Sequence, residues 1–226
     1  MRQKERARAV FDRLRSARPV VKTELEYGSP FQLTVAVVLS AQCTDKRVNM
    51  TTPRLFGRYP DAAAMKAADE EELFGIISAI TYPRSKARHL IALSRMLDEE
   101  FGGVLPDTLA GLQRLPGVGR KTANVLLSVL FDRNTIAVDT HVYRVSRRIG
   151  LVPLTANTPL KVEQKLLAVV PPEHLPDAHH RLLLHGRYLC TARKPLCGEC
   201  PLRELCRHYA LRMRAESKKE KIPQSL

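Results

Sequence analysis

Four cysteines lie within a short stretch near the end of the chain and have the chemistry of metal ligands. Their spacing is C-x6-C-x2-C-x5-C, and they are Cys190, Cys197, Cys200 and Cys206. Each interval contains a proline or a glycine, which predicts a loop that can wrap around a metal centre. Zinc sites tend to have two short C-x2-C pairs and this segment has one, so the spacing leaves Zn²⁺ and a [4Fe–4S] cluster as alternatives. The fifth cysteine, Cys43, is expected to be a small helix-packing residue.

A second group of candidate functional residues surrounds two closely spaced glycines. Residues 115–119 read Leu-Pro-Gly-Val-Gly between two helical patterns, which predicts a helix-hairpin-helix. Gly117 and Gly119 permit a tight turn and a close approach to a ligand, and the amides that follow, with Arg120, favour a phosphate. Lys121 falls in the first turn of the second helix, where we expect a partly desolvated amine that can act as a nucleophile. The alternatives are a plain turn between core helices and a solvated lysine that only contacts phosphate.

A carboxylate follows at the start of the next predicted helix. The short apolar run 135–138 ends at Asp139, which can cap the helix and can also lie near Lys121 as a functional acid. His141 follows two residues later. The same helix carries a basic stripe that favours phosphate contacts, with a solvated polar face as the alternative; its members are Arg144, Arg147 and Arg148.

The elements that must position these residues are helices. Apolar residues recur at helical spacing almost throughout, and the best strand candidate, 135–138, is too short for a sheet, so we expect an all-α fold of about ten helices. The clearest patterns lie at 5–16, after Ser29-Pro30, around 73–80, around 90–97, and over 120–131, 140–149, 158–169 and 177–190. Gly102-Gly103 is expected to end the fourth of these helices. The charged segment 217–226 is expected to be a mobile tail.

Composition excludes some classes and favours a polyanionic partner. The chain has 226 residues with a net charge of +14 and 44% hydrophobic residues, enough for a packed core. Residues 1–22 contain eight basic and two acidic groups, whereas residues 61–107 contain five basic and nine acidic groups. No apolar run is long enough for a membrane span, and the charged N-terminus does not have a signal-peptide pattern. We therefore expect a cytoplasmic protein without a disulfide framework, whose basic surface meets nucleic acid.

These motifs, in this order, resemble the endonuclease III family of helix-hairpin-helix DNA glycosylases with abasic-site lyase activity. The resemblance rests on LPGVGRKTANV, VDTHVYR and the cysteine spacing, with support from SAQCTD and LHGRYLC, and covers roughly residues 6–210. It implies a two-lobed fold: a six-helix barrel over 24–133 with the hairpin, and a second lobe formed by 1–23 and 134–226. It also implies a [4Fe–4S] cluster rather than zinc. The partner would be double-stranded DNA with a damaged base or abasic site, bound by a monomer associated with the nucleoid.

The resemblance also implies roles for individual residues. Lys121 matches the catalytic lysine and Asp139 the catalytic aspartate in the excision of oxidised pyrimidines and nicking by β-elimination. Gln42 matches the residue that fills the gap left by the extruded nucleotide. Positions around the lesion pocket match Ser40, Asp45 and His141, and the loop between the first two cysteines would bring Arg193 and Lys194 to DNA. Alternatives are a mismatch adenine glycosylase, which lacks the lysine at position 121, a non-catalytic DNA-binding module and an electron-transfer protein.

One segment departs from the family pattern. Where relatives commonly have Gly-Leu-Tyr-Asn-Ser-Lys, residues 81–86 read Thr-Tyr-Pro-Arg-Ser-Lys. Tyr82 therefore stands at the position of the aliphatic wedge, and we expect it to stack on the orphaned base, with packing on the barrel as the alternative. Threonine tolerates a positive φ poorly, and Pro83 should favour an extended conformation of Tyr82. A stiffer loop and a narrower substrate range are expected.

Overall fold

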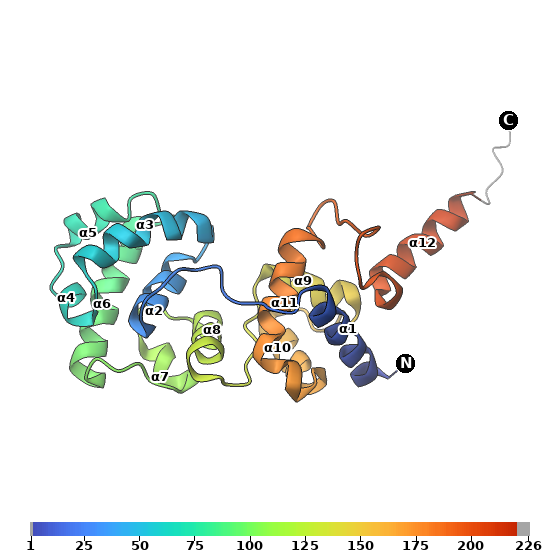
Figure 1. The fold of residues 1–226 in the computed structure, drawn as a ribbon, viewed down its shortest axis with the longest axis horizontal. Helices are drawn as coiled ribbons and strands as arrows, with labels where there is room; N and C mark the ends of the chain where they lie inside the picture. The colour runs from blue at the N-terminus through green and yellow to red at the C-terminus, as the bar shows by residue number, and fades with distance from the viewer. Residues whose placement is uncertain (1, 221–226) are drawn as a thin grey trace. The chain divides into compact units, whose positions relative to one another are not determined.

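The computed structural model describes residues 2–220 and contains helices and loops, with no strand among those residues (Figure 1). The chain divides into two compact units, residues 23–133 and the segments before and after them. Seven helices begin at a serine, threonine or aspartate whose side chain accepts a hydrogen bond from the first turn. Such caps satisfy amide groups that a helix cannot pair internally. In the described part of the chain, no helix is long and apolar enough to cross a membrane.

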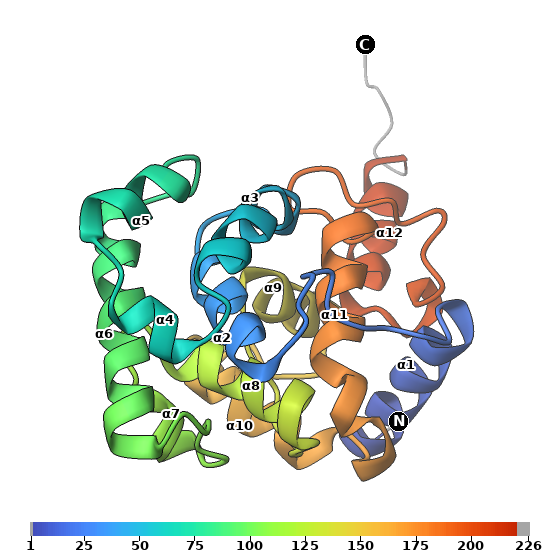
Figure 2. The same cartoon turned by 60° about the vertical axis from the view of Figure 1, so that its left-hand side comes forward.

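The unit formed by residues 23–133 is built around one enclosed helix. Its elements are α2 (Pro30–Leu39), α3 (Asp45–Arg58), α4 (Ala62–Lys66), α5 (Glu70–Ile76), α6 (Pro83–Phe101), α7 (Leu109–Arg114) and α8 (Arg120–Phe131). Helix α2 packs against α3, α6 and α8, and every residue of it except Pro30 and Gln32 is buried (Figure 2). This enclosure explains why its sequence is apolar all round rather than on one stripe.

The other unit joins the beginning of the chain to its second half. Its elements are α1 (Gln3–Ala17), α9 (Thr140–Ile149), α10 (Pro159–Val169), η1 (Pro172–His174), α11 (Leu175–Tyr188), η2 (Arg203–Leu205) and α12 (Arg207–Glu220). Helix α1 contributes Ala7, Val10, Phe11 and Leu14 to a core shared with α9, α10 and α11. Helices α9 and α11 lie side by side and form the largest helix contact of this unit.

Several sequence predictions differ from the observed helices. The apolar stripe around 73–80 extends past the end of α5. Ile77 is the C-cap of that helix, and Ile80 lies in the turn that follows, although both side chains are buried. The predicted mobile tail begins within α12, because residues 217–220 continue that helix; residues 221–226 lie outside the described part. Three further helices that the sequence patterns did not indicate are α3, α4 and α12. By contrast, α6 ends at Gly102 in the left-handed conformation (φ 59°), as predicted.

Candidate active site and iron–sulfur centre

The hairpin before α8 presents an exposed backbone turn. Gly117 has a φ of +80°, and a Cβ there would lie 3.1 Å from the Cβ of His89, so the turn requires glycine for two reasons. The amide of Val118 donates to the carbonyl of Leu115 at 3.0 Å and closes the turn. Gly119 is the N-cap of α8 with an ordinary φ of −83°, and a Cβ there would meet open space. A side chain at 119 would therefore obstruct only a ligand that approaches the helix start from outside.

Lys121 lies at the second position of α8 and is exposed, as is its neighbour Arg120. The orientation of the helix buries Thr122 and the residues that follow it and turns the first two toward solvent. Partial desolvation of the Lys121 amine stays a prediction.

The residues predicted to surround the lesion follow the end of α2. Ser40 and Asp45 are half-buried, whereas Gln42 between them is exposed. The hydroxyl of Ser40 donates to the carbonyl of Val37 at 2.9 Å, and Asp45 is the first residue of α3. Gln42 has a φ of +56°, a left-handed conformation that is uncommon for residues other than glycine. The third predicted pocket residue, His141, belongs to the other unit.

Tyr82 does not adopt the extended conformation that the sequence predicted. It is the N-cap of α6, with φ 56° and ψ 51°, and 62% of its surface is exposed. Pro83 disfavours the right-handed conformation for Tyr82. In the left-handed conformation, the carbonyl of Tyr82 accepts a 3.1 Å hydrogen bond from the Lys86 amide in the first turn of α6. Thr81 itself has no positive φ. The exposure of Tyr82 contradicts the alternative that this ring packs on the barrel.

Asp139 lies at the start of α9, directly after the buried residues 136–138. Its carboxylate Oδ1 accepts a 2.7 Å hydrogen bond from the amide of Val142, so the predicted capping role is confirmed. The side chain is half-buried, which leaves the carboxylate partly accessible.

The arginines of α9 are engaged within their own unit. Arg144 donates to the carbonyls of Gly186 at 2.9 Å and Cys190 at 3.2 Å, and it lies 3.2 Å from Nδ1 of His141. Arg148 donates to the carbonyls of Thr191 and Ala192, both at 2.7 Å. These contacts hold the loop after the first cysteine, and a phosphate contact by Arg144 stays a prediction. The sequence pattern did not indicate this loop-holding role.

The four predicted ligands line one cavity together with Ile149, Leu189, Leu196 and Leu202. Burial raises the pKa values of the Cys200 and Cys206 thiols, and the other cysteines add to this effect, so four thiolates require a cation between them. Within residues 2–220, no three histidine, cysteine or acidic side chains are arranged to hold a single metal ion. Four cysteines around one cavity provide the four thiolate ligands that a [4Fe–4S] cluster takes.

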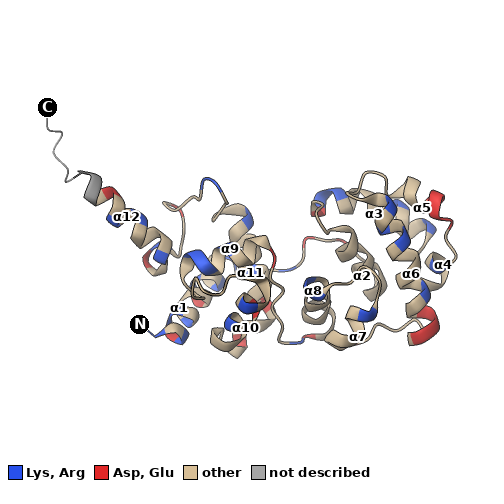
Figure 3. Cartoon of the chain, turned by 180° about the vertical axis from the view of Figure 1, so that it is seen from behind, with Lys and Arg blue, Asp and Glu red and all other residues tan. Residues whose placement is uncertain are grey.

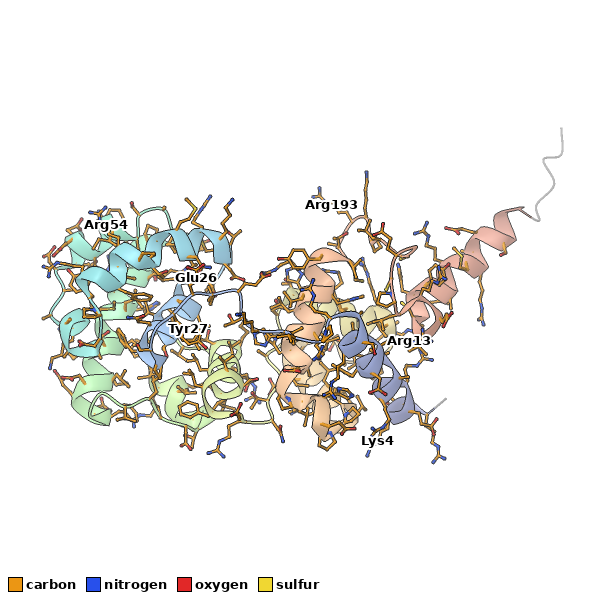
Figure 4. All side chains as sticks on the ribbon, in the orientation of Figure 1. Lys4, Arg13, Glu26, Tyr27, Arg54 and Arg193 are labelled. Carbon is orange, nitrogen blue, oxygen red and sulfur yellow. The ribbon has the colours of Figure 1, made fainter. Side chains whose placement is uncertain are left out.

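One further side chain contacts the cysteine cluster, and two basic side chains are exposed on its loop. Burial lowers the pKa of His185 to about 4, so its imidazole is neutral at pH 7, and its Nε2 lies 3.7 Å from Sγ of Cys200. Arg193 and Lys194 are exposed, and Figure 4 shows Arg193 at the outer end of the loop. Within the 23–133 unit, acidic residues gather on α5 and at the end of α6 (Figure 3).

Comparison with known proteins identifies the class to which this fold and these sites belong. Residues 35–172 match the helix-hairpin-helix superfamily of base excision DNA repair proteins, and residues 190–206 match the iron–sulfur binding domain of endonuclease III. The chain is 50% identical over 198 residues to endonuclease III of Treponema pallidum and 46% identical over 199 residues to that of Escherichia coli K12. Each alignment covers 88% of this chain and 93% of the relative.

The solved structures agree with this assignment. A trapped endonuclease III–DNA covalent intermediate has a TM-score of 0.88 at 44% identity, covering 95% of this chain and all of the other. A thermostable thymine-DNA glycosylase, at 20% identity and a TM-score of 0.83, shares the fold. The chain belongs to the endonuclease III family. It is a DNA-binding DNA glycosylase and abasic-site lyase of base excision repair, and it carries a [4Fe–4S] cluster.

The purified protein is expected to be yellow-brown and to contain about four iron atoms per chain, as a [4Fe–4S] centre requires. Cys197→Ser should lose most of this iron because it removes one of four thiolates. Cys43→Ser is the matched control and should keep it, since Cys43 lies half-buried in the turn between α2 and α3, rather than in a helix as expected, and does not line the cavity. Iron analysis and the visible spectrum measure both. A colourless protein with one zinc ion would contradict the assignment.

Proposed function

We propose that this enzyme excises oxidised pyrimidines from duplex DNA and nicks the resulting abasic site through a Schiff base on Lys121. The observation that carries the proposal is the place of Lys121, an exposed primary amine in the first turn of α8, two residues after Gly119. A DNA backbone bound at the hairpin would bring a deoxyribose within reach of that amine. A related enzyme that was solved as a trapped covalent intermediate with DNA supports the same chemistry.

The proposed reaction begins when the damaged nucleotide leaves the base stack, because its C1′ cannot be reached inside the duplex. The neutral amine of Lys121 attacks C1′, and the bond to the base breaks, with the electron pair leaving on the base, which takes up a proton. The sugar ring opens to a protonated Schiff base, which acidifies the C2′ proton. Loss of that proton breaks the C3′–O bond and releases the 3′ phosphate. Water then hydrolyses the Schiff base and returns the free lysine.

Asp139 supplies a negative charge for these reaction steps. Its carboxylate would stabilise the positive charge that develops on the sugar and assist the proton transfers. The capping bond to Val142 engages Oδ1 and holds the carboxylate in one orientation. The four cysteines, with every ligand supplied by protein, would hold the cluster as a scaffold that presents Arg193 and Lys194 to phosphate.

The remaining predicted residues divide between backbone binding and lesion recognition. Backbone contacts are assigned to the hairpin glycines and to arginines; these residues are Gly117, Gly119, Arg120 and Arg144. The pocket for the extruded base is assigned to Ser40, Asp45 and His141. Gln42 and Tyr82 are assigned to the gap that the extruded nucleotide leaves, and the exposure of both side chains supports this assignment. The enzyme is proposed to act as a monomer in the cytoplasm, on the nucleoid.

Borohydride trapping of the wild-type enzyme tests this function directly. Duplexes with an abasic site or thymine glycol should each give a covalent protein–DNA adduct, because borohydride reduces the Schiff base to a stable amine. An undamaged duplex and an adenine-mismatch duplex should give none. Absence of an adduct on both damaged duplexes would contradict the proposal. Adduct on the abasic duplex alone would restrict the enzyme to lyase activity and remove the oxidised pyrimidine from its substrates.

A further inference from the structure

Two loops of the 23–133 unit that are far apart in sequence are joined by a single side chain. The hydroxyl of Thr81 donates a 2.9 Å hydrogen bond to the backbone carbonyl of Gln42. Thr81 directly precedes Tyr82, so the bond connects the loops that carry the two exposed side chains assigned to the DNA gap. A glycine, the residue that family members commonly have at this position, has no side chain to make this connection.

Both of these loops are strained. Among residues 2–220, three residues other than glycine have a positive φ, and two of them are Gln42 and Tyr82. A left-handed conformation costs free energy for such residues and persists only where neighbouring groups enforce it. Burial cannot enforce it here, because Gln42 is exposed and Tyr82 is 62% exposed. Hydrogen bonds to the backbone must therefore hold these left-handed conformations.

One of those hydrogen bonds lies within the turn, where the amide of Cys43 donates to the carbonyl of Ser40 at 3.0 Å, and others come from the segment that contains Thr81. Lys86 as a residue is 6% exposed, and its Nζ donates to the carbonyls of Leu39 at 2.8 Å and Ala41 at 2.6 Å. Lys86 thereby fixes the chain on one side of Gln42, and Thr81 fixes the carbonyl of Gln42 itself. The start of α6 therefore acts as a template for the turn after α2.

We propose that Thr81 is a positioning residue that couples Gln42 to Tyr82, so that both side chains are presented to the opened duplex as one preformed unit. The proposal rests on the roles assigned above to Gln42 and Tyr82. A preformed pair loses less conformational freedom on binding than two independent loops. The resulting gain in affinity should appear with duplex DNA, which must be opened, and should be absent with single-stranded DNA.

Removal of the hydroxyl by Thr81→Val is expected to weaken binding to a duplex with a tetrahydrofuran abasic analogue by about three- to tenfold, the effect of one neutral hydrogen bond. Thr81→Ser keeps the hydroxyl and should stay within about twofold of the wild type. Ser78→Ala is the matched control, because the Ser78 hydroxyl donates to the carbonyl of Gly75, at the end of the preceding helix α5, at 3.0 Å. It should bind as the wild type does.

Two further measurements separate positioning from a general loss of structure. Cleavage of single-stranded abasic DNA and the melting temperature should be the same for Thr81→Val and Thr81→Ser. In a Gln42→Ala or a Tyr82→Ala background, Thr81→Val should add less to the loss of duplex binding than it does alone, because one of the coupled side chains is already missing. If Thr81→Val melts earlier than the wild type, Thr81→Ala repeats the comparison without the added methyl group.

Equal duplex binding by Thr81→Val and the wild type would overturn the proposal, as would full additivity in both backgrounds or failure of Thr81→Ser to restore binding. Each of these results is distinct from a failure of the proposed function. In that case the wild-type enzyme would give no borohydride adduct, whatever residue stands at position 81.

Discussion

Lys121→Ala is expected to abolish the borohydride-trapped adduct while the variant still binds abasic duplex DNA. The amine is the only group of this side chain that can form the Schiff base, and its exposed place in the first turn of α8 means that its removal leaves no cavity in the core. Trapping on an abasic duplex, followed by denaturing gel electrophoresis, measures the adduct, and a binding assay with the same DNA measures affinity.

Two matched variants separate the nucleophile from its charge. Lys121→Arg keeps a positive charge, but a guanidinium stays protonated and does not form a Schiff base, so this variant should also give no adduct. Arg120→Ala removes the neighbouring exposed cation and should still give the adduct at saturating enzyme. A wild-type yield of adduct from Lys121→Ala would refute the assignment, and Lys121 would then be a phosphate contact.

Asp139→Asn is expected to slow base removal by roughly 10²–10⁴-fold, the range of acid–base and electrostatic contributions. Asparagine caps helices about as well as aspartate, so the variant removes the charge and keeps the bond to the Val142 amide. Single-turnover kinetics on a thymine glycol duplex measures the rate, and thermal melting checks that the fold is intact.

A second capping residue in the same unit provides the control for stability. Thr158 caps α10 through the amide of Lys161, and Thr158→Ala should cost about 1 kcal/mol of stability without slowing the reaction. If Asp139→Asn turns over at the wild-type rate, Asp139 is a helix cap and the carboxylate has no part in catalysis.

Helices with a clear apolar pattern and a recognisable cap could be predicted from the sequence. The expected helices over 120–131 and 140–149 agree residue for residue with α8 and α9, because Gly119 and Asp139 mark their beginnings. Helix α3 was missed because Pro53 interrupts its pattern, although the helix continues through it. Helix α12 was missed because its polar sequence has no apolar stripe, so only its helix-forming residues indicate it.

In the candidate site, too, local sequence patterns predicted some features of single residues and not others. Motifs placed the cysteines around one cavity and Lys121 and Asp139 at helix starts. The conformation of Tyr82 could not be predicted, because local preferences before a proline favour an extended backbone and the actual conformation depends on where α6 begins. The bond from Thr81 to Gln42 spans 39 positions, and no local pattern indicates a contact at that distance.

The pairing of α1 with the second half of the chain has a consequence for how the protein is made. Residues 23–133 form a unit of consecutive sequence, all of which leaves the ribosome before the second half of the chain. Helix α1 emerges first, but Val142, Leu166 and Leu182, which share its core, are synthesised more than a hundred residues later. At translation rates of about 5–20 residues per second this interval is on the order of ten seconds. The apolar face of α1 therefore stays uncovered during this interval. The cysteine loop is synthesised later still, so the cluster can be inserted only near the end of synthesis.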